Sequence, residues 1–340
     1  MVDSHPKDTN SILYISFNQD SSCFALGTEN GFCIYNTIPF KDSFIRDMKG
    51  GIGIIEMLNR SNILALVGGG KNPKYAKNKL IIWDDHRAKV ISELRFNSEV
   101  KNVKLTRQHI YVVCALAIYE FDFMTFKNTQ TFQSPDNHKG LFSIAVSSNI
   151  IAYPGNTCGS IAIHQSNANS ETEKINAHQN PLSCLSLNKD GSLVASTSEK
   201  GTIIRVFSTV NNVCLKELRR GTENAEIYSI AFDNLNKFVA CTSDRKTIHL
   251  FELVDSKNSN ANDTEGNNLE QSTLTKSSKG LKTERSVFKF KVNDSKAICT
   301  FGNDDTVVVI TGDGKYHRFR YDAKTGESAV VEEKEIPLSC

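Results

Sequence analysis

The chain has 340 residues, of which 39% are hydrophobic and 23% charged, and its formal net charge is +2. This composition is typical of a globular protein with a substantial core. The weak net charge argues against nucleic-acid binding, which usually requires a strong basic bias, so any anion site must be local.

Short apolar runs of alternating character, bounded by Asn, Asp, Gly or Ser, recur from the start of the chain and predict many short strands. The first unit offers four strands, at residues 12–17, 24–27, 32–36 and 44–48. Weaker copies follow at residues 52–83, 100–123 and 142–163. The clearest unit spans residues 185–207, and residues 230–251 repeat it 45 positions later.

The last unit offers strands at residues 297–301, 306–311, 316–321 and 329–332. A spacing of about 40 to 45 residues per unit is what one blade of a β-propeller requires. The sequence therefore predicts an all-β fold, a single seven-bladed β-propeller over residues 1–340, built from degenerate WD-type repeats in which Trp83-Asp84 is the one near match to the Trp-Asp mark. Since each end unit has its own strands, we expect the ring to close by packing between blades.

Residues 255–285 interrupt the pattern. This segment has almost no large apolar residues, so it cannot bury enough surface to offset the entropy of ordering, and we predict a disordered loop. The strand-like residues 287–292 place the loop after the third strand of blade six. Its second half is basic, around Leu274 and Leu281, and we expect it to meet an anionic lipid surface.

No apolar run reaches the roughly 18 residues of a membrane span, and no signal-peptide pattern opens the chain, so we expect a cytoplasmic protein. The nine cysteines lie singly, without a Cys-x-x-Cys pair, and are expected to be reduced. Gly68-Gly69-Gly70-Lys71 lacks the spacing of a phosphate-binding loop, and no catalytic or metal-binding motif is present. We therefore expect no metal, no cofactor and no enzymatic activity.

Leu218-Arg219-Arg220-Gly221 lies between the two strongest repeats. Adjacent side chains of an extended segment point to opposite sides, so the two guanidinium groups can serve two different pockets. Arginine suits phosphate because its planar group offers several donors and keeps its charge. Both arginines are expected on exposed backbone at a blade edge.

A propeller of this length with Leu-Arg-Arg-Gly between blades five and six resembles the PROPPIN family, β-propellers that bind polyphosphoinositides. Residues 198–207 and the long blade-six loop add to the resemblance, which is greatest to the short fungal type. It implies a peripheral adaptor, monomeric in solution, that binds phosphatidylinositol 3-phosphate and phosphatidylinositol 3,5-bisphosphate. The implied membranes are vacuolar, endosomal and preautophagosomal, and an autophagy protein is a further partner to consider.

The resemblance also implies two phosphoinositide sites. The first consists of His178, Ser198, Thr202, Arg205 and Arg219, and the second of Arg220, Ser243, Thr247 and His249. Hydroxyl groups in turns more often cap their own backbone, which is the simpler interpretation of the serines and threonines. His249 aligns with Ile204 of the preceding repeat, so the two sites are not expected to be strictly equivalent.

The competing interpretation is a protein-interaction propeller that does not bind lipid. A scaffold of that kind has no need for two arginines beside hydroxyl-rich turns. Binding to liposomes with and without the phosphoinositide separates the two interpretations.

Overall fold

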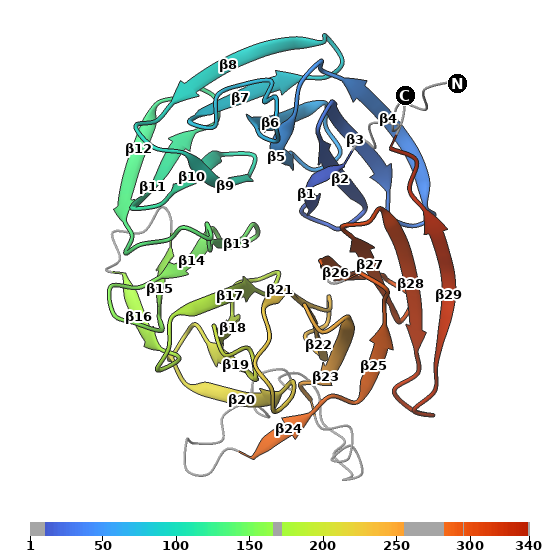
Figure 1. The fold of residues 1–340 in the computed structure, drawn as a ribbon. Helices are drawn as coiled ribbons and strands as arrows, with labels where there is room; N and C mark the ends of the chain where they lie inside the picture. Colours follow the sequence, from blue (N-terminus) through green and yellow to red (C-terminus); the bar gives the residue numbers. More distant parts are fainter. Residues whose placement is uncertain (1–10, 166–171, 255–281, 295, 339–340) are drawn as a thin grey trace, which may run out of the picture.

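The computed structural model describes residues 11–165, 172–254, 282–294 and 296–338. These residues form seven β-sheets arranged as the blades of a ring, which confirms the predicted propeller (Figure 1). The described part of the chain has no helix, hence none that could cross a bilayer. Residues 255–281, which hold most of the predicted loop with Leu274 and Leu281, lie outside the described residues.

Blades one to four each contain four consecutive strands. Blade one has β1 (Ile12–Phe17), β2 (Cys23–Thr28), β3 (Gly31–Asn36) and β4 (Lys41–Asp47). Blade two has β5 (Ile52–Met57), β6 (Ile63–Gly68), β7 (Lys79–Asp84) and β8 (Lys89–Arg95). Blade three has β9 (Val100–Leu105), β10 (His109–Cys114), β11 (Ala117–Asp122) and β12 (Asn128–Gln133). Blade four has β13 (Ser143–Ala145), β14 (Ile150–Pro154), β15 (Ser160–Gln165) and β16 (Glu173–Asn176).

The remaining blades depart from this order only at β24. Blade five has β17 (Leu182–Leu187), β18 (Leu193–Ser198), β19 (Ile203–Ser208), β20 (Cys214–Arg219) and, as a fifth strand, β24 (Thr283–Arg285). Blade six has β21 (Ile227–Phe232), β22 (Phe238–Ser243), β23 (Thr247–Glu252) and β25 (Phe288–Lys291). Blade seven has β26 (Ala297–Phe301), β27 (Thr306–Thr311), β28 (Lys315–Tyr321) and β29 (Ser328–Glu335).

The core of the described residues consists of seven hydrophobic clusters, one between each pair of neighbouring blades. Side chains alternate across a strand, so each blade gives one face to each neighbour. Between blades five and six, Ile204 and Leu218 pack with Cys241 and Phe251. This packing fixes which side chains of blade five face blade four.

Among the described residues the ring closes between blades seven and one without exchange of a strand, as the sequence predicts. Phe24, Tyr35, Phe40 and Tyr316 form a stack of aromatic rings at this interface. The hydroxyl of Tyr316 donates to the carbonyl oxygen of Thr37 at 2.9 Å. Packing and side-chain hydrogen bonds therefore join the two ends of the described chain.

The strand β24 corrects the predicted end of the blade-six loop. Thr283–Arg285 pair in parallel with β20, on its outer side and close to β25 (Figure 1). The hydroxyl of Thr283 donates to Glu217, and Lys216 forms an ion pair with Glu284 at 2.7 Å. The prediction of disorder was wrong for these three residues, because their hydrogen bonds to β20 replace the apolar burial that they lack.

Candidate functional site

The two faces of β20 separate the predicted arginines. Leu218 is buried against blade six, so Glu217 and Arg219 on either side of it face blade four. Arg219 pairs with Ile203, and Glu217 with Arg205, so these residues share one face of blade five. Arg220 follows the strand, and its Nη2 donates to the carbonyl oxygen of Glu223 in the connection to blade six. The two arginines therefore lie on opposite sides of blade five, as predicted.

The first site is organised around Arg205. Its Nη1 donates to the carbonyl oxygen of Ala177 at the end of blade four, 2.8 Å away. Its Nε and Nη2 bind Glu217 Oε2 at 3.1 and 3.0 Å. Burial by itself raises the pKa of Glu217. Hydrogen bonds from Thr283 and Arg205 lower it by more, so the pKa lies below its ordinary value and the carboxylate stays charged. Arg205 is thus held in place by two blades.

His178 lies beside this ion pair. Its Nε2 forms a 3.0 Å hydrogen bond with Ser196 Oγ, and Ser196 pairs with Arg205 across the sheet. Burial, and then the charge of Arg205, lower the pKa of His178 from 6.5 to about 4. At neutral pH the imidazole is therefore neutral and acts as a hydrogen-bonding group.

Arg219 supplies the second guanidinium group of the first site. It is half-buried, and no described residue forms a hydrogen bond or ion pair with its side chain. Ser198 is buried on the same face, in the strand that also carries Ser196. Thr202 lies in the turn before β19, where its carbonyl oxygen accepts from the backbone N–H of Arg220 at 2.9 Å. The structure brings His178, Ser198, Arg205 and Arg219 to one face.

Arg220, the cation of the second site, is buried, with a relative exposure of 8%. The prediction that it lies exposed at the blade edge was wrong. Its Nε donates to the carbonyl oxygen of Gly201 at 2.8 Å, and its Nη2 donates to that of Glu223. Burial lowers the pKa of the guanidinium group. Backbone carbonyl oxygens therefore orient Arg220, because a buried charge needs hydrogen-bond partners.

The other residues of the second site lie on β22 and β23. His249 faces blade five, as its partner Cys241 does, and its Nδ1 lies 3.1 Å from Ser286 Oγ. Burial, then the charges of Arg220 and Lys289, lower the pKa of His249 to about 4. The hydroxyls of Ser243 and Thr247 both bind the backbone of Arg245, at 3.3 Å each, which is the turn-capping role considered above.

The strand register corrects the alignment of His249. His249 pairs with Cys241 in blade six, as Arg205 pairs with Ser196 in blade five. His249 therefore occupies the place of Arg205, and not that of Ile204. The sequence alignment was wrong by one residue because the turn between β18 and β19 is one residue longer than that between β22 and β23. The two sites are more alike than predicted.

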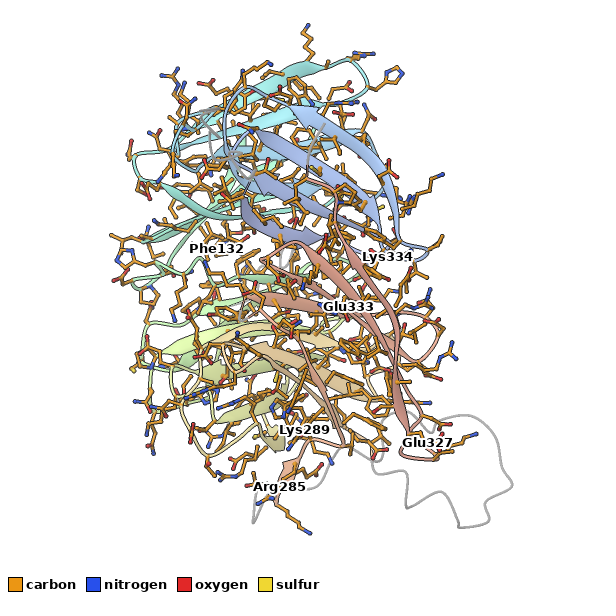
Figure 2. All side chains as sticks on the ribbon, turned by 45° about the vertical axis from the view of Figure 1, so that its right-hand side comes forward. Phe132, Arg285, Lys289, Glu327, Glu333 and Lys334 are labelled. Carbon is orange, nitrogen blue, oxygen red and sulfur yellow. The ribbon has the colours of Figure 1, made fainter. Side chains whose placement is uncertain are left out.

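Sequence reasoning missed several residues around the two sites. Glu217 and Ser286 hold Arg205 and His249, and Arg285 pairs with Arg219 across β24 and β20. Lys289 pairs with His249 from β25. Figure 2 shows Arg285 and Lys289 at the same rim of the ring. The alternation of β25, Phe-Lys-Phe-Lys, predicts that Lys289 and Lys291 share one face of the strand. It is the one sequence signal that could have identified them.

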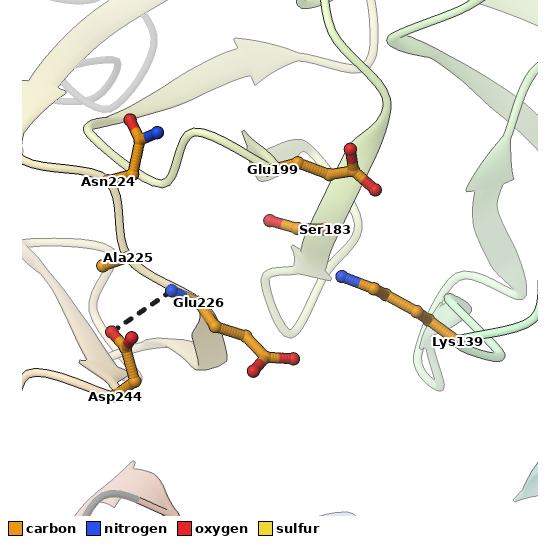
Figure 3. A pocket seen from close by; sticks show the side chains of 7 residues that line it. All are labelled: Lys139, Ser183, Glu199, Asn224, Ala225, Glu226 and Asp244. Carbon is orange, nitrogen blue, oxygen red and sulfur yellow. Dashed lines mark hydrogen bonds between the residues drawn. The ribbon is translucent and has the colours of Figure 1, made fainter.

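A shallow pocket of about 270 Å³ is lined by blade five, blade six and the connection between blades three and four (Figure 3). Its lining consists of Lys139, Ser183, Glu199, Asn224, Ala225, Glu226 and Asp244. Three carboxylates against one lysine disfavour a phosphate there, and none of the predicted site residues belongs to the lining. The predicted site residues therefore lie apart from this pocket, on the faces of blades five and six that are turned to the preceding blade.

Known proteins are similar in sequence to most of this chain. Residues 11–268 match the family model described as PROPPIN. Autophagy-related protein 18e of Arabidopsis thaliana is 36% identical over 330 residues, covering 95% of this chain and 87% of the relative. SVP1-like protein 2 of Saccharomyces cerevisiae is 40% identical over 290 residues, covering 74% of this chain and 64%, slightly under two thirds, of the relative.

Solved structures share the fold. Hsv2 of Kluyveromyces lactis superimposes with a TM-score of 0.80 at 27% identity, covering 97% of this chain and 100% of that one. A complex described as KlAtg21 with the coiled-coil of AgAtg16 superimposes with a TM-score of 0.75 at 25% identity, covering 96% of this chain. The family model spans most of the chain, including residues 218–221, and the chain belongs to the PROPPIN family.

Proposed function

We propose that this protein is a peripheral membrane adaptor that binds phosphatidylinositol 3-phosphate and phosphatidylinositol 3,5-bisphosphate at two sites on blades five and six. The observation that carries the proposal is the placement of Arg219 and Arg220 on opposite sides of blade five, where Arg219 shares its face with Arg205, the neighbour of His178, and Arg220 lies near His249. Membership of the PROPPIN family supports it. The relatives named for autophagy support a role on autophagic, vacuolar and endosomal membranes.

The chemistry of both sites suits a phosphorylated headgroup. A guanidinium group has further N–H donors beyond the two that Arg220 gives to backbone carbonyls, and no described residue accepts a hydrogen bond from the side chain of Arg219. A neutral imidazole donates one hydrogen bond to phosphate without the cost of a buried charge. Arg205 adds a guanidinium group whose position Glu217 fixes. Each site thus combines a cation with neutral donors.

The test is sedimentation with phosphatidylcholine vesicles that contain or lack phosphatidylinositol 3-phosphate. The double variant Arg219→Thr/Arg220→Thr is expected to lose binding to the lipid-containing vesicles. Arg220 is buried, so its replacement is also expected to lower the melting temperature, and the variant must be shown to be folded at the assay temperature. The exposed pair Arg87→Thr/Arg107→Thr on blades two and three is the charge-matched control and should bind as the wild type does.

Each single variant should retain one site. Two sites on one rigid ring bind a membrane with high effective concentration, so loss of either one should weaken vesicle binding by at least about tenfold. A folded double variant that still sediments with the lipid-containing vesicles would contradict the assignment and favour the protein-interaction propeller.

A protein partner is compatible with lipid binding, because the other blades remain available. The structural similarity to KlAtg21 in its complex with a coiled coil favours a helical autophagy partner. A pull-down with a recombinant coiled coil of that type, repeated with the double arginine variant, tests this second activity. Capture that does not depend on the arginines would place the partner on another surface.

A further inference from the structure

The strand β25 gives blade six its own counterpart of Arg219. In blade five, β20 pairs with β19 so that Arg219 lies opposite Ile203. In blade six, β25 pairs with β23 in the same way, and Lys291 lies opposite Thr247. Thr247 is the first residue of β23, as Ile203 is the first residue of β19. By register, Lys291 occupies in blade six the place that Arg219 occupies in blade five.

The correspondence extends to the connections between blades. The backbone N–H of His178, after blade four, donates to Gly159, which precedes β15. The backbone N–H of Arg220, after blade five, donates to Thr202, which precedes β19. Each site thus receives one residue from the end of the preceding blade, His178 in the first and Arg220 in the second.

The lysines of β25 face the second site. Phe288 and Phe290 are buried against blade seven, so Lys289 and Lys291 project from the opposite face, which also carries His249. The influence of Lys289 on the pKa of His249 agrees with this placement.

The charges on this face are not balanced within the described residues. In blade five, Glu217 neutralises Arg205. In blade six, the corresponding position opposite His249 holds Lys289, and no described residue forms an ion pair with Lys289 or Lys291. Two cations that share a strand face about 7 Å apart repel each other, and a bound anion removes that repulsion.

We propose that Lys291 is a phosphate-binding residue of the second site, where it acts with Arg220 and His249, and that Lys289 adds to the positive potential of that face. The ligand is a membrane phosphoinositide headgroup, so this assignment rests on the proposed function. It gives each site one arginine or lysine at the end of the strand that pairs with β19 or β23.

The test uses backgrounds in which one site is disabled. Lys291→Gln is made in Arg219→Thr, where binding depends on the second site, and in Arg220→Thr, where it depends on the first. Binding to phosphatidylcholine vesicles with phosphatidylinositol 3-phosphate should fall by at least about tenfold in the first background, because a charge-assisted hydrogen bond is lost. It should change by less than about twofold in the second. Lys291→Arg should restore binding in the first background.

Two controls define what overturns the proposal. Lys127→Gln removes the same charge from an exposed position between β11 and β12 of blade three, and it should change binding in neither background. If Lys291→Gln weakened binding equally in both backgrounds, Lys291 would contribute only through its general positive charge, which would contradict the proposal. Unchanged binding in the Arg219→Thr background would show that Lys291 does not bind the ligand of the second site. Failure of the wild type to distinguish the two vesicle types would contradict the proposed function itself, and this assignment with it.

Discussion

Two histidines, His178 and His249, show how burial sets the chemistry of single residues in this protein. Each has a pKa lowered from 6.5 to about 4, first by burial and then by a neighbouring arginine. The unfolded chain therefore binds more protons than the folded one between pH 6.5 and 4. The free energy of unfolding falls as the pH falls through this window.

Replacement of His249 by Gln is expected to reduce the acid sensitivity of the fold. Between pH 7 and pH 5 the titration of this one residue should cost about 2 kcal/mol of unfolding free energy, which the variant avoids. Urea denaturation of both proteins at the two pH values measures the difference. The exposed His86→Gln is the control and should leave the pH dependence of the wild type unchanged. Equal pH dependence of all three proteins would contradict the buried, neutral state of His249.

Sequence reasoning placed the site residues by alignment, and its success differed between the two sites. For Arg219 and Arg220, strand alternation was enough to predict opposite faces, since this depends only on extended backbone. The alignment of His249 with Ile204 was wrong by one residue because the length of a turn cannot be obtained from the apolar pattern of the flanking strands. The burial of Arg220 was missed because carbonyl partners leave no sequence signal.

At the scale of elements, the blades were predictable and β24 was not. The strands of blades five and six repeat a strong apolar pattern, which predicts their presence and order. Thr283–Arg285 contain no apolar residue and follow a polar stretch, so their pairing with β20 is set entirely by tertiary contacts. One of these contacts is the hydrogen bond from Thr283 of β24 to Glu217, the carboxylate that orients Arg205.

The hydrogen bond from Thr283 to Glu217 should therefore contribute measurable stability. Thr283→Val removes the donor from a half-buried carboxylate and is expected to lower the free energy of unfolding by about 1 kcal/mol. Thr283→Ser keeps the hydroxyl and should retain most of that stability. Urea denaturation at neutral pH compares them, and identical midpoints for the three proteins would show that the bond contributes nothing.

For the whole molecule, the repeat period predicted the number of blades because each blade must bury one face against each neighbour. The closure of the ring depends on the same packing, since blades seven and one share no strand in the part of the chain that the structure describes. In a ring of blades the closing interface packs the last blade against the first, so that the two ends of the chain unfold together. The aromatic stack at Phe40 and Tyr316, with ring centroids 4.7 Å apart, provides that coupling here.

The hydroxyl of Tyr316 should stabilise the closed ring as a whole. Tyr316→Phe keeps the stacked ring but leaves the carbonyl oxygen of Thr37 without its donor inside the interface, which should cost about 1–2 kcal/mol. Because closure links both ends of the ring, we expect a lower melting temperature with one unfolding transition in calorimetry. Tyr228→Phe, at a partly exposed hydroxyl in blade six, is the control and should change the free energy of unfolding by less than about 0.5 kcal/mol. A variant with two separate transitions would mean that the ends unfold independently and that packing across this interface does not close the ring cooperatively.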